Sequence, residues 1–600
     1  CILARKSGGR GKKGPARRPF AIAAPSKEIP MAHFRRVACA LNRRTLLKAS
    51  ALGGGAMLAQ RLFARSFRNL SGAAGVLRSE SGPIVETTAG KLRGAAENGI
   101  NIFKGIPYGS STAGKNRFMP PAKPEPWSGV RDALRYGASA PQTVPGGPGI
   151  LGALDFLISA ENPRDVSESE DCLVLNVWTP GINDGRKRPV MFWIHGGGFT
   201  SGSGSARLYD GANLARRGEV VVVTINHRLG ALGYTYLRDA GGEAFAASGN
   251  AGMLDIVAAL EWVRENVAGF GGDPGRVLIF GESGGGQKVS ALLAMPAAKG
   301  LFHRAVIESG PGLRMVDRAE ATKVGRMFLD ELGIKPERIK EIQAAPLERI
   351  MAAQGAVNRK LPPMTPGLIE GFAPVVDGVS LLQHPFDPLA PEVSADVPLI
   401  IGHNHTEMTL FAGADPSVFS LDEAGLQRRL KPLLKDSVDS VLRAFRSTYP
   451  QENPSGLYFL ITTAYPTVAF TEKIAERRAA LNKASTYVYE FTWPTPILGG
   501  RMRSPHTIEM PFVFDNVGDP LVQKLTGGGA DTFPLAEHVS DTWIAFARTG
   551  SPNSKNLPHW PPYSAADREV MIINTKSSVE KDPDRVAREA IEKFAFGSSA

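Results

Sequence analysis

Residues 277–286 read Val-Leu-Ile-Phe-Gly-Glu-Ser-Gly-Gly-Gly, and this stretch decides the fold. The apolar run 277–280 is typical of a buried strand, and residues 286–293 have a helical pattern. A Gly-x-Ser-x-Gly sequence at such a junction forms a sharp turn that holds the serine hydroxyl over the edge of a sheet. The five residues alone also fit a glycine-rich turn. The prediction of a nucleophile at Ser283 therefore depends on what accompanies it elsewhere in the chain.

The segments on either side predict an α/β fold with a mostly parallel sheet. Further short apolar runs, each with the length of a strand, cover residues 173–178, 190–194, 220–225, 305–307 and 399–401. Continuous apolar runs of this kind suit strands that are buried on both faces. A helical pattern over 252–266 separates two of them, and such alternation indicates a doubly wound sheet. Residues 318–357 and 417–485 are mainly helical by pattern, and we expect them to form a helical layer or cap.

Two other segments have recognisable patterns. Residues 83–94 predict a β-hairpin with its turn at Ala89-Gly90. Residues 141–170 are rich in Gly, Pro and acidic side chains and predict a long surface loop. Loops of this length in a compact domain are usually functional.

The composition is that of a soluble globular protein, with 43% hydrophobic and 21% charged residues. No run of 18 or more apolar residues occurs, so we expect no stable membrane insertion. The net charge of +12 comes from the N-terminus, since residues 1–64 hold 14 Lys and Arg and one acidic residue, Glu28. The rest of the chain is close to neutral, which gives no argument for binding nucleic acid.

The basic N-terminus resembles a bacterial export signal. Residues 42–48 place Arg43-Arg44 directly before a short, weakly hydrophobic and glycine-containing stretch at 49–59. This arrangement is similar to a twin-arginine signal, although a basic disordered tail is the alternative. We expect residues 1–70 to lie outside the fold, residues 71–600 to form a single domain, and the protein to be exported to the periplasm or secreted.

A serine nucleophile needs backbone donors for the oxyanion that it creates. The predicted strand 190–194 leads straight into His195-Gly196-Gly197-Gly198-Phe199. Glycines just past a strand can turn their N–H groups inward, because no Cβ stands in the way. A flexible linker is the alternative, but the strand before and the aromatic residue after the glycines argue against it. Gly284, directly after Ser283, supplies a further N–H.

The nucleophile also needs a base and an acid that orients the base. Glu407 follows the strand predicted at 399–401, where an α/β hydrolase places its acid. Among ten histidines, His506 lies in a loop before the apolar residues 510–514 and completes the chain order Ser283, Glu407, His506. Taken alone, His506 would be a surface histidine. The ordered set makes it the best candidate for the base.

Two other features could carry chemistry but have simpler explanations. His403 and His405 form a His-x-His pair, which could suggest a metal. No cluster of carboxylates and histidines accompanies the pair, so we expect no metal. Cys172 is the only cysteine beyond residue 70 and lies beside Leu173-Val174-Leu175, so we expect it to be a small buried hydrophobic residue.

The chain resembles the type-B carboxylesterase family, which includes bacterial para-nitrobenzyl esterases, mammalian carboxylesterases and cholinesterases. The similarity spans about residues 83 to 575. The segments that carry it are Phe103–Tyr108, Glu170–Trp178, His195–Phe199, Asn226–Gly230, Phe270–Pro274, Phe280–Gly285 and Arg548–Asn553. Several long motifs in the right order make the resemblance specific.

The resemblance implies an α/β-hydrolase fold and a carboxylic-ester hydrolase with Ser283 as nucleophile, His506 as base and Glu407 as orienting acid. Such an enzyme acts through an acyl-enzyme intermediate on a small-molecule ester and needs no cofactor or metal. Two alternatives stay open: a lipase acting on longer acyl esters, and a non-catalytic binding protein like the neuroligins. The resemblance leaves the preferred ester and the oligomeric state undecided.

The resemblance also assigns supporting residues. It implies that the N–H groups of Gly197, Gly198 and Gly284 form the oxyanion hole, and that Glu282 is a second buried glutamate that organises the site. Relatives often have alanine where Gly284 stands. Alanine offers the same N–H, so we expect only local stiffness to differ. In many relatives the cysteine matching Cys172 closes a disulfide, for which this domain has no partner cysteine.

Overall fold

A computed structural model describes residues 82–142, 167–362 and 369–597 of the 600-residue chain. They belong to a compact unit that begins at Ser81. The export signal in residues 1–70 and most of the 141–170 loop lie outside the described residues. Both therefore stay predictions, as does the domain boundary at residue 71.

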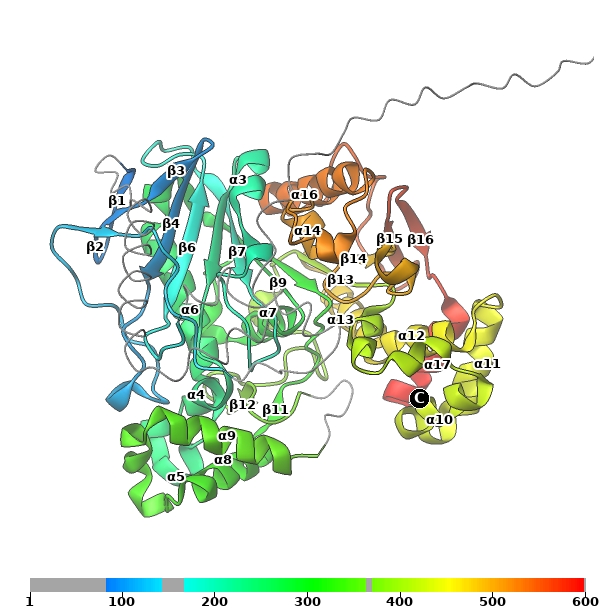
Figure 1. Ribbon diagram of the computed structural model, residues 1–600, viewed down its shortest axis with the longest axis horizontal. Coiled ribbons are helices and arrows are strands. Elements are labelled where there is room, and N and C mark those ends of the chain that lie inside the picture. Colours follow the sequence, from blue (N-terminus) through cyan, green and yellow to red (C-terminus); the bar gives the residue numbers. More distant parts are fainter. Residues whose placement is uncertain (1–81, 143–166, 363–368, 598–600) are drawn as a thin grey trace, which may run out of the picture. The chain divides into compact units, whose positions relative to one another are not determined.

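The described unit is built on a mixed sheet of eleven strands (Figure 1), in the order β16-β15-β14-β13-β10-β9-β7-β8-β6-β4-β3. Every pair from β8 through β7, β9, β10, β13 and β14 to β15 is parallel, and the outer pairs are antiparallel. The parallel centre confirms the predicted fold. The strands span Ala95–Glu97 (β3), Ile100–Pro107 (β4), Val174–Thr179 (β6), Arg188–Ile194 (β7), Val221–Ile225 (β8), Gly272–Glu282 (β9), Arg304–Glu308 (β10), Leu399–Asn404 (β13), Thr486–Phe491 (β14), Glu569–Ile573 (β15) and Ser578–Lys581 (β16).

All six strands predicted around the serine turn are present, and β9 starts earlier than its apolar run. The sequence does not reveal β3, β4, β14, β15 or β16. The strand β14 reads Thr-Tyr-Val-Tyr-Glu-Phe, so polar residues interrupt its apolar pattern. Its parallel pairing with β13 and β15 is what makes it a strand. Such long-range pairing is invisible in a short sequence window.

A smaller three-stranded sheet holds the predicted hairpin. Its strands are β1 (Ile84–Thr87), β2 (Gly90–Arg93) and β5 (Val130–Asp132). Thr87 pairs with Gly90, so the turn residues are Thr88 and Ala89, one position before the predicted pair. The strand partner of Thr87 is therefore the glycine that we expected within the turn.

Helices cover both faces of the large sheet, and side chains of the strands contribute to a separate hydrophobic core on each face. Along β7, Phe192 and Ile194 pack in one core with residues of α6 and α7, while Met191 and Trp193 pack in the other with residues of α3 and α16. This alternation explains why residues 190–194 of β7 are apolar without interruption. These helices span Ala212–Gly218 (α3), Ala251–Asn266 (α6), Gly284–Ala294 (α7) and Thr532–Thr549 (α16).

The two segments predicted to be helical form separate groups. Around residues 318–357 lie α8 (Arg318–Leu332) and α9 (Leu347–Lys360), which contribute to the core of α6 and α7. Residues 417–485 hold α10 (Glu423–Leu434), α11 (Val438–Thr448), α12 (Pro454–Thr463) and α13 (Ala469–Ala480). The C-terminal helix α17 (Arg585–Phe596) joins α10, α11 and α12 in a small core of its own, and these helices lie side by side in Figure 1.

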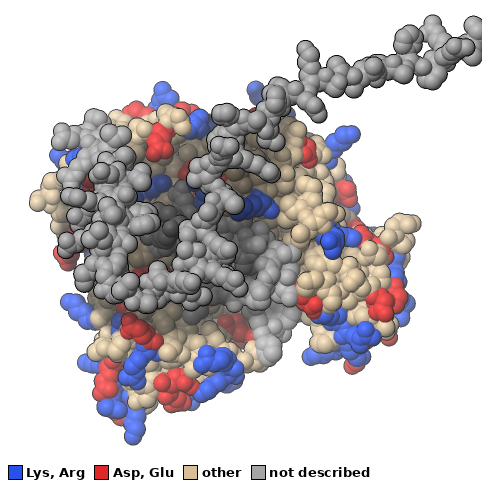
Figure 2. All heavy atoms as spheres, in the orientation of Figure 1, with Lys and Arg blue, Asp and Glu red and all other residues tan. Residues whose placement is uncertain are grey.

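The described surface carries both signs of charge. Figure 2 shows Lys and Arg interspersed with Asp and Glu on the face in view. Within the three described ranges, no helix has the length and apolar character needed to cross a bilayer.

The shorter helices are α4 (Gly230–Tyr234), α5 (Arg238–Gly241), α14 (Met510–Val513) and α15 (Gln523–Thr526).

Candidate active site

Ser283 lies in a strained turn between β9 and α7. Its backbone has φ 59° and ψ −123°, a region that a non-glycine residue rarely adopts. Its N–H donates to Glu308 O at 2.9 Å, which ties the turn to the end of β10. A Cβ on Gly281 would come within 2.6 Å of Ile194 O, and one on Gly285 within 2.1 Å. Both glycines are therefore required for the close approach of β7, and the turn has the geometry of a nucleophile elbow.

The predicted base and acid meet beside this turn. His506 Nδ1 lies 2.5 Å from Glu407 Oε2, and the backbone N–H of Asn404 donates to Glu407 Oε1 at 2.7 Å. Both side chains are buried. An ionised carboxylate can only accept a hydrogen bond, so in this contact Nδ1 carries the proton and Nε2 is the ring nitrogen left for a second partner. Glu407 begins a short 3-10 turn directly after β13, as its place after a predicted strand implies.

His506 contacts the elbow at Glu282. Its Nε2 lies 3.1 Å from Glu282 Oε1, but this oxygen has no aligned hydrogen bond. Among the described residues, Ser283 Oγ makes no hydrogen bond to the ring either. Catalytic hydrogen bonds are often long before substrate binds. The structure therefore places His506 next to the elbow without a hydrogen bond between its ring and Ser283 Oγ.

The charges around His506 shift its pKa and that of its neighbour. Burial lowers the pKa of His506, but the carboxylates of Glu282 and Glu407 outweigh burial and raise it to about 10. Burial raises the pKa of Glu282 to about 8, although the nearby His506 opposes the rise. The pair therefore titrates as a unit, and the proton on the imidazole is stabilised by two carboxylates.

Two further glutamates that sequence reasoning missed lie under the site. Glu509 accepts hydrogen bonds from Ser309 Oγ at 2.9 Å and from Asn404 Nδ2 at 2.5 Å. Glu308 ends β10 and accepts from Trp543 Nε1 at 2.6 Å. Burial raises the pKa of Glu509 to about 7 and that of Glu308 well above its usual range. Two features of the sequence could have pointed to them. Glu308 stands at the end of an apolar strand, and Glu509 follows the candidate base His506 by three residues.

The glycine run after β7 is a loop in which the first two glycine carbonyls have partners close by in the chain. Gly196 O faces His195 Nδ1 at 2.9 Å, and Gly197 O accepts from Ser201 N at 3.1 Å. Each N–H points opposite to the carbonyl of the same trans peptide, so the N–H groups of Gly197 and Gly198 point the other way. Both of these glycines have positive φ, at 80° and 61°. The role of these N–H groups in an oxyanion hole stays a prediction.

Gly284 packs directly against this loop. A Cβ on Gly284 would lie 2.3 Å from Gly198 O and 2.4 Å from Gly198 Cα. Alanine would therefore push the loop away, so the expectation that only local stiffness is at stake is wrong. The glycine at this position sets how closely the loop approaches the start of α7.

Cys172 and the histidines beside the glycine loop are structural. Cys172 is fully buried and free, as expected. His195 and His227 stack with ring centroids 4.7 Å apart and planes within 9°. Burial lowers the pKa of His195 to about 3 and that of His227 well below its usual value, and the charge of Lys288 adds to both shifts. Both rings are therefore neutral.

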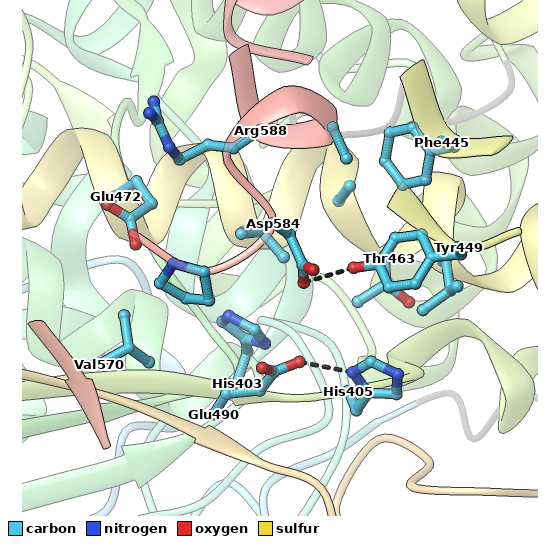
Figure 3. A pocket seen from close by; sticks show the side chains of 15 residues that line it. His403, His405, Phe445, Tyr449, Thr463, Glu472, Glu490, Val570, Asp584 and Arg588 are labelled. Atoms are coloured by element: carbon cyan, nitrogen blue, oxygen red, sulfur yellow. Dashed lines mark hydrogen bonds and ion pairs between the residues drawn. The ribbon is translucent and has the colours of Figure 1, made fainter. Parts of the chain in front are cut away.

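His403 and His405 line a pocket of their own (Figure 3). His405 Nδ1 pairs with Glu490 Oε1 at 2.6 Å, and the Tyr449 hydroxyl donates to Asp584. Successive side chains of β13 alternate between its faces, so His403 points away from the site that its neighbour Asn404 supports. His405 follows the end of the strand and lines the same pocket as His403. Within the described ranges, no group of three or more His, Cys, Asp or Glu side chains is placed to hold a metal ion.

Comparison with known proteins finds a matching family and several similar enzymes. A model of the Carboxylesterase family matches residues 81–590. The chain is 37% identical over 514 residues to para-nitrobenzyl esterase of Bacillus subtilis, covering 85% of this chain and 98% of that protein. It is 35% identical to phenmedipham hydrolase of Pseudarthrobacter oxydans, covering 84% and 98%. A solved structure of a Geobacillus stearothermophilus carboxylesterase superposes with a TM-score of 0.72 at 37% identity, covering 84% of this chain and 99% of the other.

Proposed function

The chain belongs to the carboxylesterase family, and we propose that Ser283, His506 and Glu407 carry out its hydrolysis of carboxylic esters. The observation that carries this assignment is the buried hydrogen bond between His506 and Glu407 beside the strained elbow. It fixes Nδ1 of the imidazole on Glu407 and leaves Nε2 next to Glu282, the residue before Ser283. A base held in this way is what an ordinary serine hydroxyl needs to become a nucleophile.

The proposed reaction has two steps of acyl transfer. His506 Nε2 takes the proton of Ser283 Oγ, which attacks the ester carbonyl and forms a tetrahedral oxyanion. The N–H groups of Gly197, Gly198 and Gly284 stabilise the oxyanion. The imidazolium then protonates the leaving alcohol, and the acyl group stays on Ser283. Water, deprotonated by His506, attacks the acyl carbonyl and releases the acid, and the proton returns to Ser283.

Replacing the nucleophile tests this assignment. We expect Ser283→Ala to lower kcat/KM for para-nitrophenyl acetate at least about 10⁴-fold, because no acyl-enzyme can form. The exposed Ser440 on α11 provides the control, because its hydroxyl donates to Ser437 O and has no part in the proposed reaction. Circular dichroism of both variants verifies the fold. Full activity of Ser283→Ala would refute the assignment.

We propose in addition that the preferred esters carry an aromatic group. The ring of Phe411 is 43% exposed, and its centroid lies 5.2 Å from that of His506. An exposed aromatic ring beside the base offers a stacking surface for an aryl group of the substrate. Two relatives, para-nitrobenzyl esterase and phenmedipham hydrolase, bear names that refer to such compounds.

The aromatic preference is tested by removing the ring. Phe411→Ala should raise KM for benzyl acetate about 10-fold while changing KM for ethyl acetate little, because only the aryl ester loses the stacking partner. Phe533, an exposed aromatic residue of α16, gives the control Phe533→Ala. Equal changes for both esters would argue against the preference. Activity confined to aggregated long-chain esters would favour a lipase instead.

We infer export from the sequence of the N-terminus alone. Arg43 and Arg44 precede a weakly hydrophobic stretch, as in twin-arginine signals. Replacing both with lysine should retain the esterase inside a bacterial host, whereas the unaltered chain reaches the periplasm. Fractionation of the cells with an activity assay measures this. Equal periplasmic activity of both chains would contradict the inference.

A further inference from the structure

Lys288 is a buried cation that the proposed mechanism does not use. It lies on α7 and is 0% exposed. Its Nζ donates to Gly198 O at 2.7 Å and to His195 O at 3.0 Å. The ring of Phe199 lies on a further side, with its centroid 5.4 Å from Nζ. Every one of these partners belongs to the glycine loop that follows β7.

Burying an ammonium group is expensive unless it is paired. Among the described residues, no carboxylate lies within 4.0 Å of Lys288 Nζ, so backbone carbonyls are its hydrogen-bond partners. Burial lowers the pKa of Lys288 to about 7, although the charge of Glu282 opposes the decrease. A neutral amine also keeps two N–H groups, so both protonation states can hold the two carbonyls.

The two carbonyls stand at the two ends of the loop. Four consecutive carbonyls, those of residues 195 to 198, each have a partner. Gly196 O and Gly197 O are held within the loop by His195 and Ser201, while Lys288 holds the first and the last. The N–H groups of Gly197 and Gly198 belong to the peptides between His195 O and Gly198 O. Lys288 Nζ therefore contacts the loop on both sides of these peptides.

Helix geometry explains how one side chain reaches both ends. Gly284 and Lys288 are four residues apart on α7, so they lie on the same face. That face is in contact with the loop, since a Cβ on Gly284 would lie within 2.5 Å of Gly198 N. The glycine lets the loop approach the helix, and the lysine one turn later holds it there.

We propose that Lys288 is a positioning residue that fixes the glycine loop in the conformation that binds the oxyanion. Its charge beneath the loop also favours the negative charge that develops there. This inference rests on the proposed function. It predicts a loss specific to the transition state, because the loop contacts the oxyanion and not the rest of the ester.

The variant Lys288→Met keeps an unbranched side chain that is one atom shorter and removes its N–H donors. We expect kcat for para-nitrophenyl acetate to fall about 10- to 100-fold with KM changed less than about 2-fold, a smaller effect than removal of an oxyanion donor itself. Affinity for an aryl trifluoromethyl ketone, which forms an oxyanion on the enzyme, should fall by the same factor. The exposed Lys299, just beyond α7, supplies the control Lys299→Met, which should leave all three quantities unchanged.

The outcomes separate positioning from a merely structural role. If Lys288→Met loses thermal stability but keeps kcat and ketone affinity, the inference is wrong. If Lys288→Met does not fold, Lys288→Gln decides, because its uncharged amide is one bond shorter and cannot hold both Gly198 O and His195 O as the lysine does. A kcat at least about 5-fold below that of the unaltered enzyme, at unchanged KM, supports the inference, and unaltered kcat overturns it. Activity that survives Ser283→Ala would instead refute the proposed function itself.

Discussion

At the scale of single residues, the site is a cluster of carboxylates around one imidazole. Glu407 orients His506 through Nδ1, while Glu282 lies 3.1 Å from Nε2, the atom that must accept the proton of Ser283. Burial disfavours the imidazolium, but the two carboxylates outweigh it and raise the pKa of His506 to about 10. A base must be neutral before it acts, so a raised pKa moves the acid limb of the activity profile to higher pH.

This arrangement predicts the effect of neutralising one carboxylate. Glu282→Gln removes a negative charge beside Nε2, so the imidazolium is less stabilised and the pKa of His506 falls. The acid limb of kcat/KM against pH should move to lower pH by about one unit or more. Hydrolysis of para-nitrophenyl acetate between pH 5 and 10 measures the limb. A limb that stays in place, or moves to higher pH, would show that Glu282 does not control the base.

The residues of the site differ in how far the sequence reveals them. Ser283 and Glu407 could be proposed from the sequence because each follows a predicted strand, and His506 because it completes the chain order of the fold. The structure brings His506 and Glu407 together. Glu308 and Glu509 could not be, since their burial depends on which strand ends and loops meet in space. The crowding at Gly284 was likewise invisible, because it depends on the distance between α7 and a loop some 90 residues earlier in the chain.

At the scale of elements, local patterns predict the buried strands and the longer helices. Side chains of β7 point alternately into two cores, so all seven of its residues are buried. The strands β14 to β16 escape prediction because pairing across the sheet outweighs their mixed composition. The C-terminal helix α17 is a comparable case, since it is stabilised by packing against α11 and not by propensity alone.

The packing of α17 yields a prediction about stability. Ile591 is 2% exposed and lies in the small core shared with α10, α11 and α12. Ile591→Ala should lower the free energy of unfolding by about 2–4 kcal/mol, because it leaves a cavity there. Val586 of the same helix is 52% exposed, so Val586→Ala should have little effect. Thermal and urea unfolding measure both, and equal destabilisation by the two variants would contradict the packing.

At the scale of the whole described unit, the sheet gathers the site from distant parts of the chain. The strands β7, β9, β10 and β13 are neighbours and run parallel, so their carboxyl ends lie along one edge. The glycine loop, the elbow, Glu308 and Glu407 each follow or end one of these strands. Open α/β sheets place their sites at this edge. The fold therefore accounts for a constellation whose members span more than 300 positions of the chain.

The central claim is that Ser283 alone forms the covalent intermediate. The most direct measurement is mass spectrometry of the intact protein and of its peptides after reaction with a fluorophosphonate, which loses fluoride to an activated serine. We predict one adduct per chain, on the peptide that contains Ser283, with loss of esterase activity in proportion to labelling. An adduct on another residue, or full activity after stoichiometric labelling of Ser283, would contradict the claim.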